Sequence, residues 1–260
     1  MDPGAATRAG GRVSVVGVPL DRVTLAGALE RVDEAIATRT GMQHMAINAA
    51  KIVKLQHDHA LREAVEACEL ITADGQAVVW AARFLGQPLP ERVAGIDLME
   101  AILDRAPARG YRVYLLGAKP DVLEAAAARI EERFPGISVA GLRHGYFSSD
   151  EEPEVAAAIR DARADVLFVA LTTPKKELFL ARWRDTLAVP FVMGVGGSFD
   201  VLAGRRRRAP RALQRLGLEW AYRLAQDPRH LLGRYAIGNT IFSWLVARAA
   251  LRRALGAVRP

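Results

Sequence analysis

Short runs of β-branched and other apolar residues alternate with longer segments of helical periodicity over most of this chain. Runs of this kind predict strands, which we expect at residues 13–18, 42–47, 69–72, 111–116, 137–140, 166–171 and 191–195. Helical patterns separate them, at residues 24–38, 49–68, 76–85, 96–105, 121–134, 152–163 and 174–187. Parallel strands need such crossover helices, so the alternation predicts an α/β fold, a Rossmann-like parallel sheet with helices on both faces.

Charge divides the chain into a mildly acidic body and a basic tail. From residue 205 onward there are 13 arginines and two acids, Glu219 and Asp227, whereas residues 1–204 contain 23 basic and 27 acidic groups. We therefore expect a flexible Gly- and Ala-rich leader at residues 1–10, an α/β catalytic domain at 11–204 and a basic helical appendage at 205–260. The appendage should contain two helical stretches, broken near Pro228.

The tail mixes its arginines with leucine and aromatic residues. A basic amphipathic helix of this composition suits a membrane surface that contains anionic lipids. One alternative is an ordinary helix packed on the body with its arginines in solvent, and another is a nucleic-acid-binding segment. We favour the membrane over nucleic acid because the tail has no motif of spaced base-reading residues.

Cysteine and histidine content bears on location and on metals. Cys68 is the single cysteine, which fits a reducing compartment, and its helical pattern favours a small core residue over a nucleophile. The N-terminus does not resemble a signal peptide and no run of about 18 apolar residues occurs, so a cytoplasmic location is expected. The five histidines lack metal-ligand spacing and no Asp-any-Asp triad is present, so neither a metal nor another cofactor is expected.

Four loops follow the expected strands, at Asn48, at residues 73–75, at 117–119 and at 194–200. Ligands of parallel sheets bind at these carboxyl ends. Asp74, in ITADGQAVVW, could accept a proton from a sugar hydroxyl, or it could cap the helix that follows it. Its position alone favours the cap.

Glycines in the last of these loops suit a phosphate. Gly194, Gly196 and Gly197 stand in VMGVGGSFD, where their backbone amides could approach an anion, although a tight structural turn explains them equally well. The loop lacks the third glycine of the dinucleotide fingerprint, and no helix obviously follows it, which weakens a nicotinamide-dependent oxidoreductase as an interpretation. Gly117, in LLGAKP, is a weaker signal of the same kind.

Several segments together resemble the WecG/TagA/CpsF family of glycosyltransferases over nearly the whole chain. They are INAAKIV, ADGQAVVWAARFLGQPLPERVAGIDLMEAI, VYLLGAKPDVL, the PKKE segment and GVGGSFDVLAGRRRRAPRALQRLGLEWAYRL. The resemblance implies inverting, metal-independent transfer from a UDP-sugar, usually UDP-N-acetylmannosamine. The acceptor it implies is N-acetylglucosamine linked to undecaprenyl diphosphate, at the inner face of the cell membrane, and the product is an early intermediate of a wall or surface polymer.

The resemblance also implies roles for individual residues. Asp74 matches the proposed catalytic base and Asn48 the polar residue after the second strand. The loop that contains Gly196, Gly197 and Asp200 would hold the donor together with Gly117 and Lys176. The tail matches an appendage that completes the site and meets the membrane. Candidates for diphosphate binding are therefore Arg223, Arg229 and Arg234.

Some positions depart from the family pattern. Ala46 stands where a threonine is common, Lys176 replaces the glutamine of PKQE, and His230 and Gly233 stand where arginine is usual. Lysine suits a phosphate or carboxylate, whereas glutamine offers neutral hydrogen bonds, so a donor other than N-acetylmannosamine, such as one with a carboxylate, is a second hypothesis. A non-catalytic nucleic-acid-binding or membrane-adaptor protein is the alternative from another class. Whether the chain forms a homo-oligomer is left open.

Overall fold

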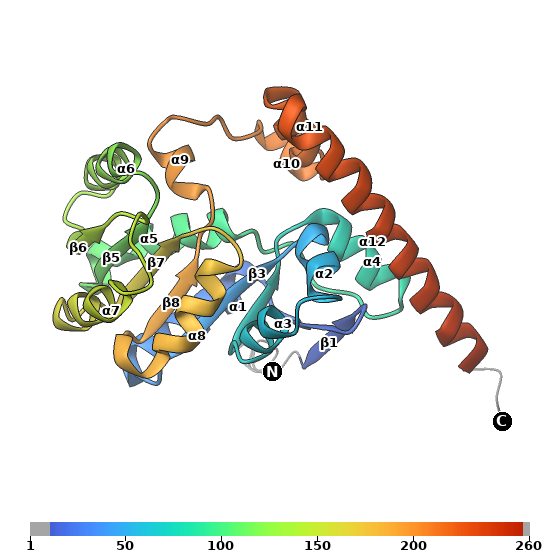
Figure 1. Ribbon diagram of the computed structural model, residues 1–260, viewed down its shortest axis with the longest axis horizontal. Helices are drawn as coiled ribbons and strands as arrows, with labels where there is room; N and C mark the ends of the chain where they lie inside the picture. The colour runs from blue at the N-terminus through green and yellow to red at the C-terminus, as the bar shows by residue number, and fades with distance from the viewer. Residues whose placement is uncertain (1–10, 257–260) are drawn as a thin grey trace, which may run out of the picture.

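The computed structural model describes residues 11–256 and contains one six-stranded parallel sheet, a separate hairpin and helices on both sheet faces (Figure 1). The strands are β1 (Arg12–Val15), β2 (Val18–Asp21), β3 (Met42–Ile47), β4 (Leu70–Ala73), β5 (Arg112–Gly117), β6 (Ser138–Arg143), β7 (Val166–Ala170) and β8 (Phe191–Gly194). The sheet has the order β4-β3-β8-β7-β5-β6. The predicted α/β class and parallel sheet are confirmed.

Helices connect these strands and also form the C-terminal part of the chain. They are α1 (Leu25–Thr38), α2 (Ala49–Leu55), α3 (His59–Glu66), α4 (Gln76–Phe84), α5 (Gly95–Arg109), α6 (Pro120–Arg133), α7 (Glu152–Asp161), α8 (Lys175–Leu187), α9 (Ser198–Leu202), α10 (Arg211–Arg215), α11 (Glu219–Gln226) and α12 (Pro228–Gly256). The expected break near Pro228 is confirmed, because α11 ends just before it and α12 begins at it.

Two expectations about local structure are wrong. The expected strand at 13–18 is an antiparallel hairpin, because Val16 and Gly17 have φ values of 53° and 77° and form a two-residue turn between β1 and β2. Such turns require positive φ at both central residues, which Gly17 supplies without strain. The glycine loop after β8 is followed by a helix after all, the five-residue α9.

The two sheet faces have separate hydrophobic cores because successive strand residues point to opposite sides. In β5, Val113 and Leu115 pack with α1, α5 and α6, whereas Tyr114 and Leu116 pack with α7 and α8. A third core joins the hairpin, β3, β4, α2, α3 and α4. Cys68 is buried in this third core, and burial raises its pKa to about 12, so the predicted core role is confirmed.

Helix α12 is the long red helix of Figure 1, and it packs along α2. Phe242 and Val246 enter the third core and are 5% and 8% exposed, while Trp244 and Ile237 are 56% and 65% exposed. Arg253 donates a hydrogen bond to the carbonyl of Leu85, just after α4. The tail is thus attached to the body along one side of α12 and presents large apolar residues on another. None of the helices in residues 11–256 has the length and apolar character needed to cross a membrane.

Candidate active site

The register of β3 and β4 brings two predicted site residues together. Ile47 pairs with Ala73 in this parallel ladder, so the residues that follow them, Asn48 and Asp74, leave the sheet side by side. The amide of Asp74 donates to the carbonyl of Ile47 at 2.8 Å, which extends the pairing by one residue. Asn48 Oδ1 accepts from the amide of Lys51 at 2.9 Å and caps α2.

Asp74 does not cap the helix that follows it. The N-cap residue of α4 is Gly75 and makes no side-chain bond. Instead, Asp74 Oδ1 accepts a hydrogen bond from the amide of Gly95, the first residue of α5, at 3.1 Å. The predicted cap of the following helix is therefore wrong, because the carboxylate binds an amide 21 residues further along the chain. The carboxylate is partly exposed, so it is both oriented and accessible.

A groove with a volume of about 610 Å³ begins at these two residues. Its polar end includes Asn48, Asp74 and, from the tail, Arg223. Helix α4 begins beside Asp74 and extends away from it, so Trp80 and Phe84 continue the lining about one and two turns further along. The opposite wall is the side of α12 that contains Gly238, Asn239, Phe242, Ser243, Val246 and Ala247. The groove is therefore charged at one end and mainly apolar along its length.

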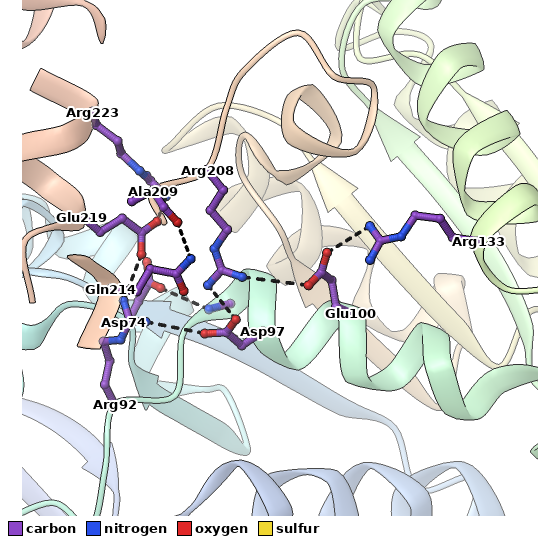
Figure 2. Close-up of polar contacts among 11 residues, drawn as sticks. Asp74, Arg92, Asp97, Glu100, Arg133, Arg208, Ala209, Gln214, Glu219 and Arg223 are labelled. Atoms are coloured by element: carbon purple, nitrogen blue, oxygen red, sulfur yellow. Dashed lines mark hydrogen bonds and ion pairs between the residues drawn. The ribbon is translucent and has the colours of Figure 1, made fainter. Parts of the chain in front are cut away.

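Arg223 belongs to a cluster of ion pairs that joins the tail to the body (Figure 2). Its Nη2 lies 2.7 Å from Glu219 Oε1, and Arg92 Nη1 lies 3.0 Å from Glu219 Oε2. Burial opposes the charge of Glu219, but Arg223 and the hydrogen bond from Arg92 outweigh burial and lower its pKa. Burial likewise opposes the charge of Arg223, yet the carboxylates of Glu219 and Asp74 raise its pKa overall. At neutral pH both side chains are therefore ionised.

A second set of ion pairs continues from this cluster along α5. Arg92 Nη2 lies 3.6 Å from Asp97 Oδ2, and Arg208 Nη2, from the segment between α9 and α10, lies 2.6 Å from Asp97 Oδ1. Glu100 follows one turn later, 3.9 Å from Arg208 and 3.1 Å from Arg133 (Figure 2). The start of α5 thus contacts both the connection to the tail and, through Gly95, the carboxylate of Asp74.

The family model of the glycosyl transferase WecG/TagA/CpsF family matches residues 13–256, nearly the whole chain. The chain belongs to this family. It is a glycosyltransferase of cell-wall polysaccharide synthesis. Membership favours an enzyme over the non-catalytic alternative.

The other predicted site residues of this glycosyltransferase lie outside the groove. Gly196 and Gly197 are exposed at the end of β8, and Asp200 is partly buried in α9. Gly117 has a packing reason of its own, because a Cβ atom there would lie 2.5 Å from the backbone carbonyl of Ala170 in β7. All four are at the carboxyl edge of the sheet, as expected, but further from Asp74 along the strand order.

Lys176 is buried, in a cluster close to β8. Its Nζ lies 3.0 Å from Glu177 Oε1, which also pairs with Lys51 Nζ at 2.9 Å. The side chain of Lys176 packs so closely against Gly194 that a Cβ there would lie 2.5 Å from its Cε. Burial and the charge of Lys51 lower the pKa of Lys176 to about 8. Burial opposes the charge of Glu177, but Lys51 and Lys176 lower its pKa to about 2.

The tail arginines differ in their placement. Arg223 lines the groove, whereas Arg229 is exposed at the beginning of α12 and is not part of its lining. The side chain of Arg234 lies outside the described part of the structure. Sequence reasoning did not single out Arg92 or Glu219. A usable signal existed, because Glu219 is one of only two acids after residue 204.

Proposed function

We propose that this glycosyltransferase transfers a sugar from a UDP-sugar to a sugar linked to undecaprenyl diphosphate, with inversion at the anomeric carbon. Asp74 is the general base in this proposal. Its carboxylate takes the proton of the acceptor hydroxyl as that oxygen attacks the anomeric carbon. The bond from this carbon to the diphosphate breaks, and UDP leaves with the electron pair. Attack from the face opposite to the leaving group inverts the configuration.

The observation that carries the proposal is the position of Asp74 at the charged end of the groove. A general base must be oriented and within reach of the proton that it removes. The Gly95 amide holds Asp74 Oδ1 at 3.1 Å, and Arg223 supplies a cation at the same end of the groove. Guanidinium groups form paired hydrogen bonds with phosphate oxygens. Arg223 is therefore suited to a diphosphate held close to the base.

The length of the groove suits the lipid part of the acceptor. Beyond its charged end, the lining is formed by Trp80 and Phe84 on one side and by Phe242 and Val246 on the other. A polyprenyl chain buries apolar surface against such residues, and each buried methylene contributes about 0.8 kcal/mol. A water-soluble acceptor would leave this surface without a matching partner.

The donor belongs, in this proposal, to the glycine loop after β8. Gly196 and Gly197 are exposed and have no side chain to obstruct a phosphate. Asp200, Gly117 and Asn48 lie at the same sheet edge. Lys176 acts from the buried cluster, where it and Lys51 place two cations beside one carboxylate close to Gly194. N-acetylmannosamine is the donor sugar suggested by the family, and a sugar with a carboxylate is the one suggested by this excess of positive charge.

The tail places the enzyme, in this proposal, on the inner face of the cell membrane. It combines 13 arginines with exposed apolar residues, and these include Trp220, Leu232, Ile237, Trp244 and Leu251. Each basic residue close to an anionic surface contributes about 1 kcal/mol of binding. A chain bound in this way meets an acceptor that is anchored in the same membrane.

A transfer assay on the full chain tests the reaction. The purified protein is supplied with a panel of UDP-sugars, including UDP-N-acetylmannosamine and an acidic UDP-sugar, and with N-acetylglucosamine on a short polyprenyl diphosphate. Mass spectrometry of the lipid product identifies the sugar transferred. Absence of any transfer over the whole panel would contradict the proposed reaction.

Asp74→Asn tests the base. An asparagine oxygen can still accept the Gly95 amide, so the variant should fold and bind UDP, yet it cannot take a proton. We expect transfer to fall about 10²–10⁴-fold. Asp121→Asn is the matched control, because it makes the same substitution at an exposed aspartate that pairs with Arg205 and does not line the groove. Near-normal turnover by Asp74→Asn would remove Asp74 from the role of base.

A further inference from the structure

Glu219 is an acid in a strongly basic segment, and both of its oxygens are occupied. Oε1 pairs with Arg223 of the same helix and Oε2 pairs with Arg92 of the body, while only 11% of the Glu219 side chain is exposed. Positions four residues apart lie on one face of a helix, so Glu219 and Arg223 face the groove together. Arginine side chains have many rotamers, and fixing one costs free energy that a neighbouring charge can offset.

We propose that Glu219 is a positioning residue that directs Arg223 toward the charged end of the groove, with Arg92 as its anchor on the body. This inference rests on the proposed function, in which Arg223 binds a diphosphate. The side chain of Arg223 is 54% exposed and would otherwise sample many directions. Arg92 is only 15% exposed and fixes the carboxylate from the opposite side. Glu219 can therefore hold Arg223 in one direction.

The same short segment of the body holds both charged groups of the site. Gly95 donates its amide to Asp74, and Arg92, three residues earlier, binds Glu219. Asp97, two residues later, contacts Arg92 and takes Arg208 from the connection to the tail. Docking of the tail onto residues 92–97 thus sets the position of Arg223 relative to Asp74 (Figure 2).

Anion binding distinguishes a positioning role of Glu219 from a purely electrostatic effect, because the two predict opposite changes in anion affinity for Glu219→Gln. A carboxylate close to an anion site repels the anion, so electrostatics alone predicts that Glu219→Gln binds anions more tightly. Positioning predicts weaker binding, because Arg223 loses its orientation. We expect inorganic pyrophosphate, measured by calorimetry on the full chain, to bind at least about tenfold more weakly to Glu219→Gln, the size of one charge-assisted hydrogen bond.

A double-mutant cycle separates positioning of Arg223 from general support of the tail. In an Arg223→Gln background, Glu219→Gln should cause no further loss of pyrophosphate binding, since its effect passes through Arg223. Arg205→Gln is the matched control, because Arg205 and Asp121 form another tail-to-body ion pair with both partners exposed. Its binding should equal that of the wild type.

Three results would overturn the inference. They are unchanged or tighter pyrophosphate binding by Glu219→Gln, an equal loss in the Arg223→Gln background, and no binding by the wild type. If hydrogen exchange shows that Glu219→Gln unfolds α11, Glu219→Asp replaces it as the test, because it keeps the charge and shortens the side chain. Only weaker pyrophosphate binding by Glu219→Asp would then support positioning. Failure of sugar transfer with pyrophosphate binding intact would instead contradict the proposed reaction alone.

Discussion

Two aromatic residues of α12, Phe242 and Trp244, allow the attachment of the tail to be separated from its exposed surface. They are two positions apart, so they project about 200° from each other around the helix. Phe242 is 5% exposed and packs in the core formed with α2 and α4, while Trp244 is 56% exposed. Substitution of each by alanine should therefore affect different properties.

Phe242→Ala should lower stability substantially. Removing a buried phenylalanine costs about 3–5 kcal/mol, because contacts are lost and a cavity remains. Since Phe242 attaches α12 to the body through this core, the loss should appear as faster hydrogen exchange along α12 as well as a lower urea midpoint. Trp244→Ala should change stability by no more than about 0.5 kcal/mol, but it should reduce co-sedimentation with anionic liposomes, since tryptophan favours the membrane interface.

The comparison of these two variants decides the matter. Equal stability of Phe242→Ala and Trp244→Ala would refute the docking of α12 by its Phe242 side. Undiminished liposome binding by Trp244→Ala, measured at low salt with the same lipids, would remove the exposed apolar surface from membrane binding. Circular dichroism of both proteins checks that the helix content of the body is retained.

Two further predictions concern the buried cluster and metals. The pKa of Lys176 is about 8 in the folded chain and 10.5 in an ordinary lysine. Between these two pH values the unfolded state binds more protons than the folded state. The free energy of unfolding therefore rises with pH over this range, by about 3 kcal/mol in total. Lys176→Gln should lose this rise in urea unfolding at pH 7.5, 8.5 and 9.5, and an unchanged slope would contradict it. The proposed mechanism has no metal-dependent step, and no group of three or more His, Cys, Asp or Glu side chains suited to an ion occurs in residues 11–256. Transfer should therefore survive EDTA, and loss of activity that magnesium or manganese restores would reveal an ion site.

The sheet could be predicted because its signals are local. Strand runs such as Val166–Ala170 are continuous and apolar, and the helices between them follow a 3.6-residue period. The hairpin was missed because the apolar run continues through the turn, where Gly17 is the single local sign of positive φ. The prediction failed where one residue, rather than a pattern, determines the backbone.

The site was only partly predictable, since its contacts cross long sequence separations. Asn48 and Asp74 follow neighbouring parallel strands, so a loop-by-loop analysis found both. The bond from Gly95 to Asp74 and the pairs of Glu219 depend on how α5 and α11 pack, which local periodicity does not encode. Lys176 was singled out for its charge, but its burial depends on the tight approach to Gly194.

The two walls of the groove come from segments that are far apart in the sequence, α4 in one wall and α12 in the other. A ribosome delivers Asp74 early and completes the last sheet strand at Gly194, yet Arg223 and the lining residues of α12 come near the end. Every strand is therefore available before the second wall of the groove exists. A nascent chain that stops before α11 would present Asp74 without Arg223 and without the α12 wall of the groove. In the proposed mechanism such a chain lacks the diphosphate-binding arginine, which comes with the segment that gives the chain its net positive charge.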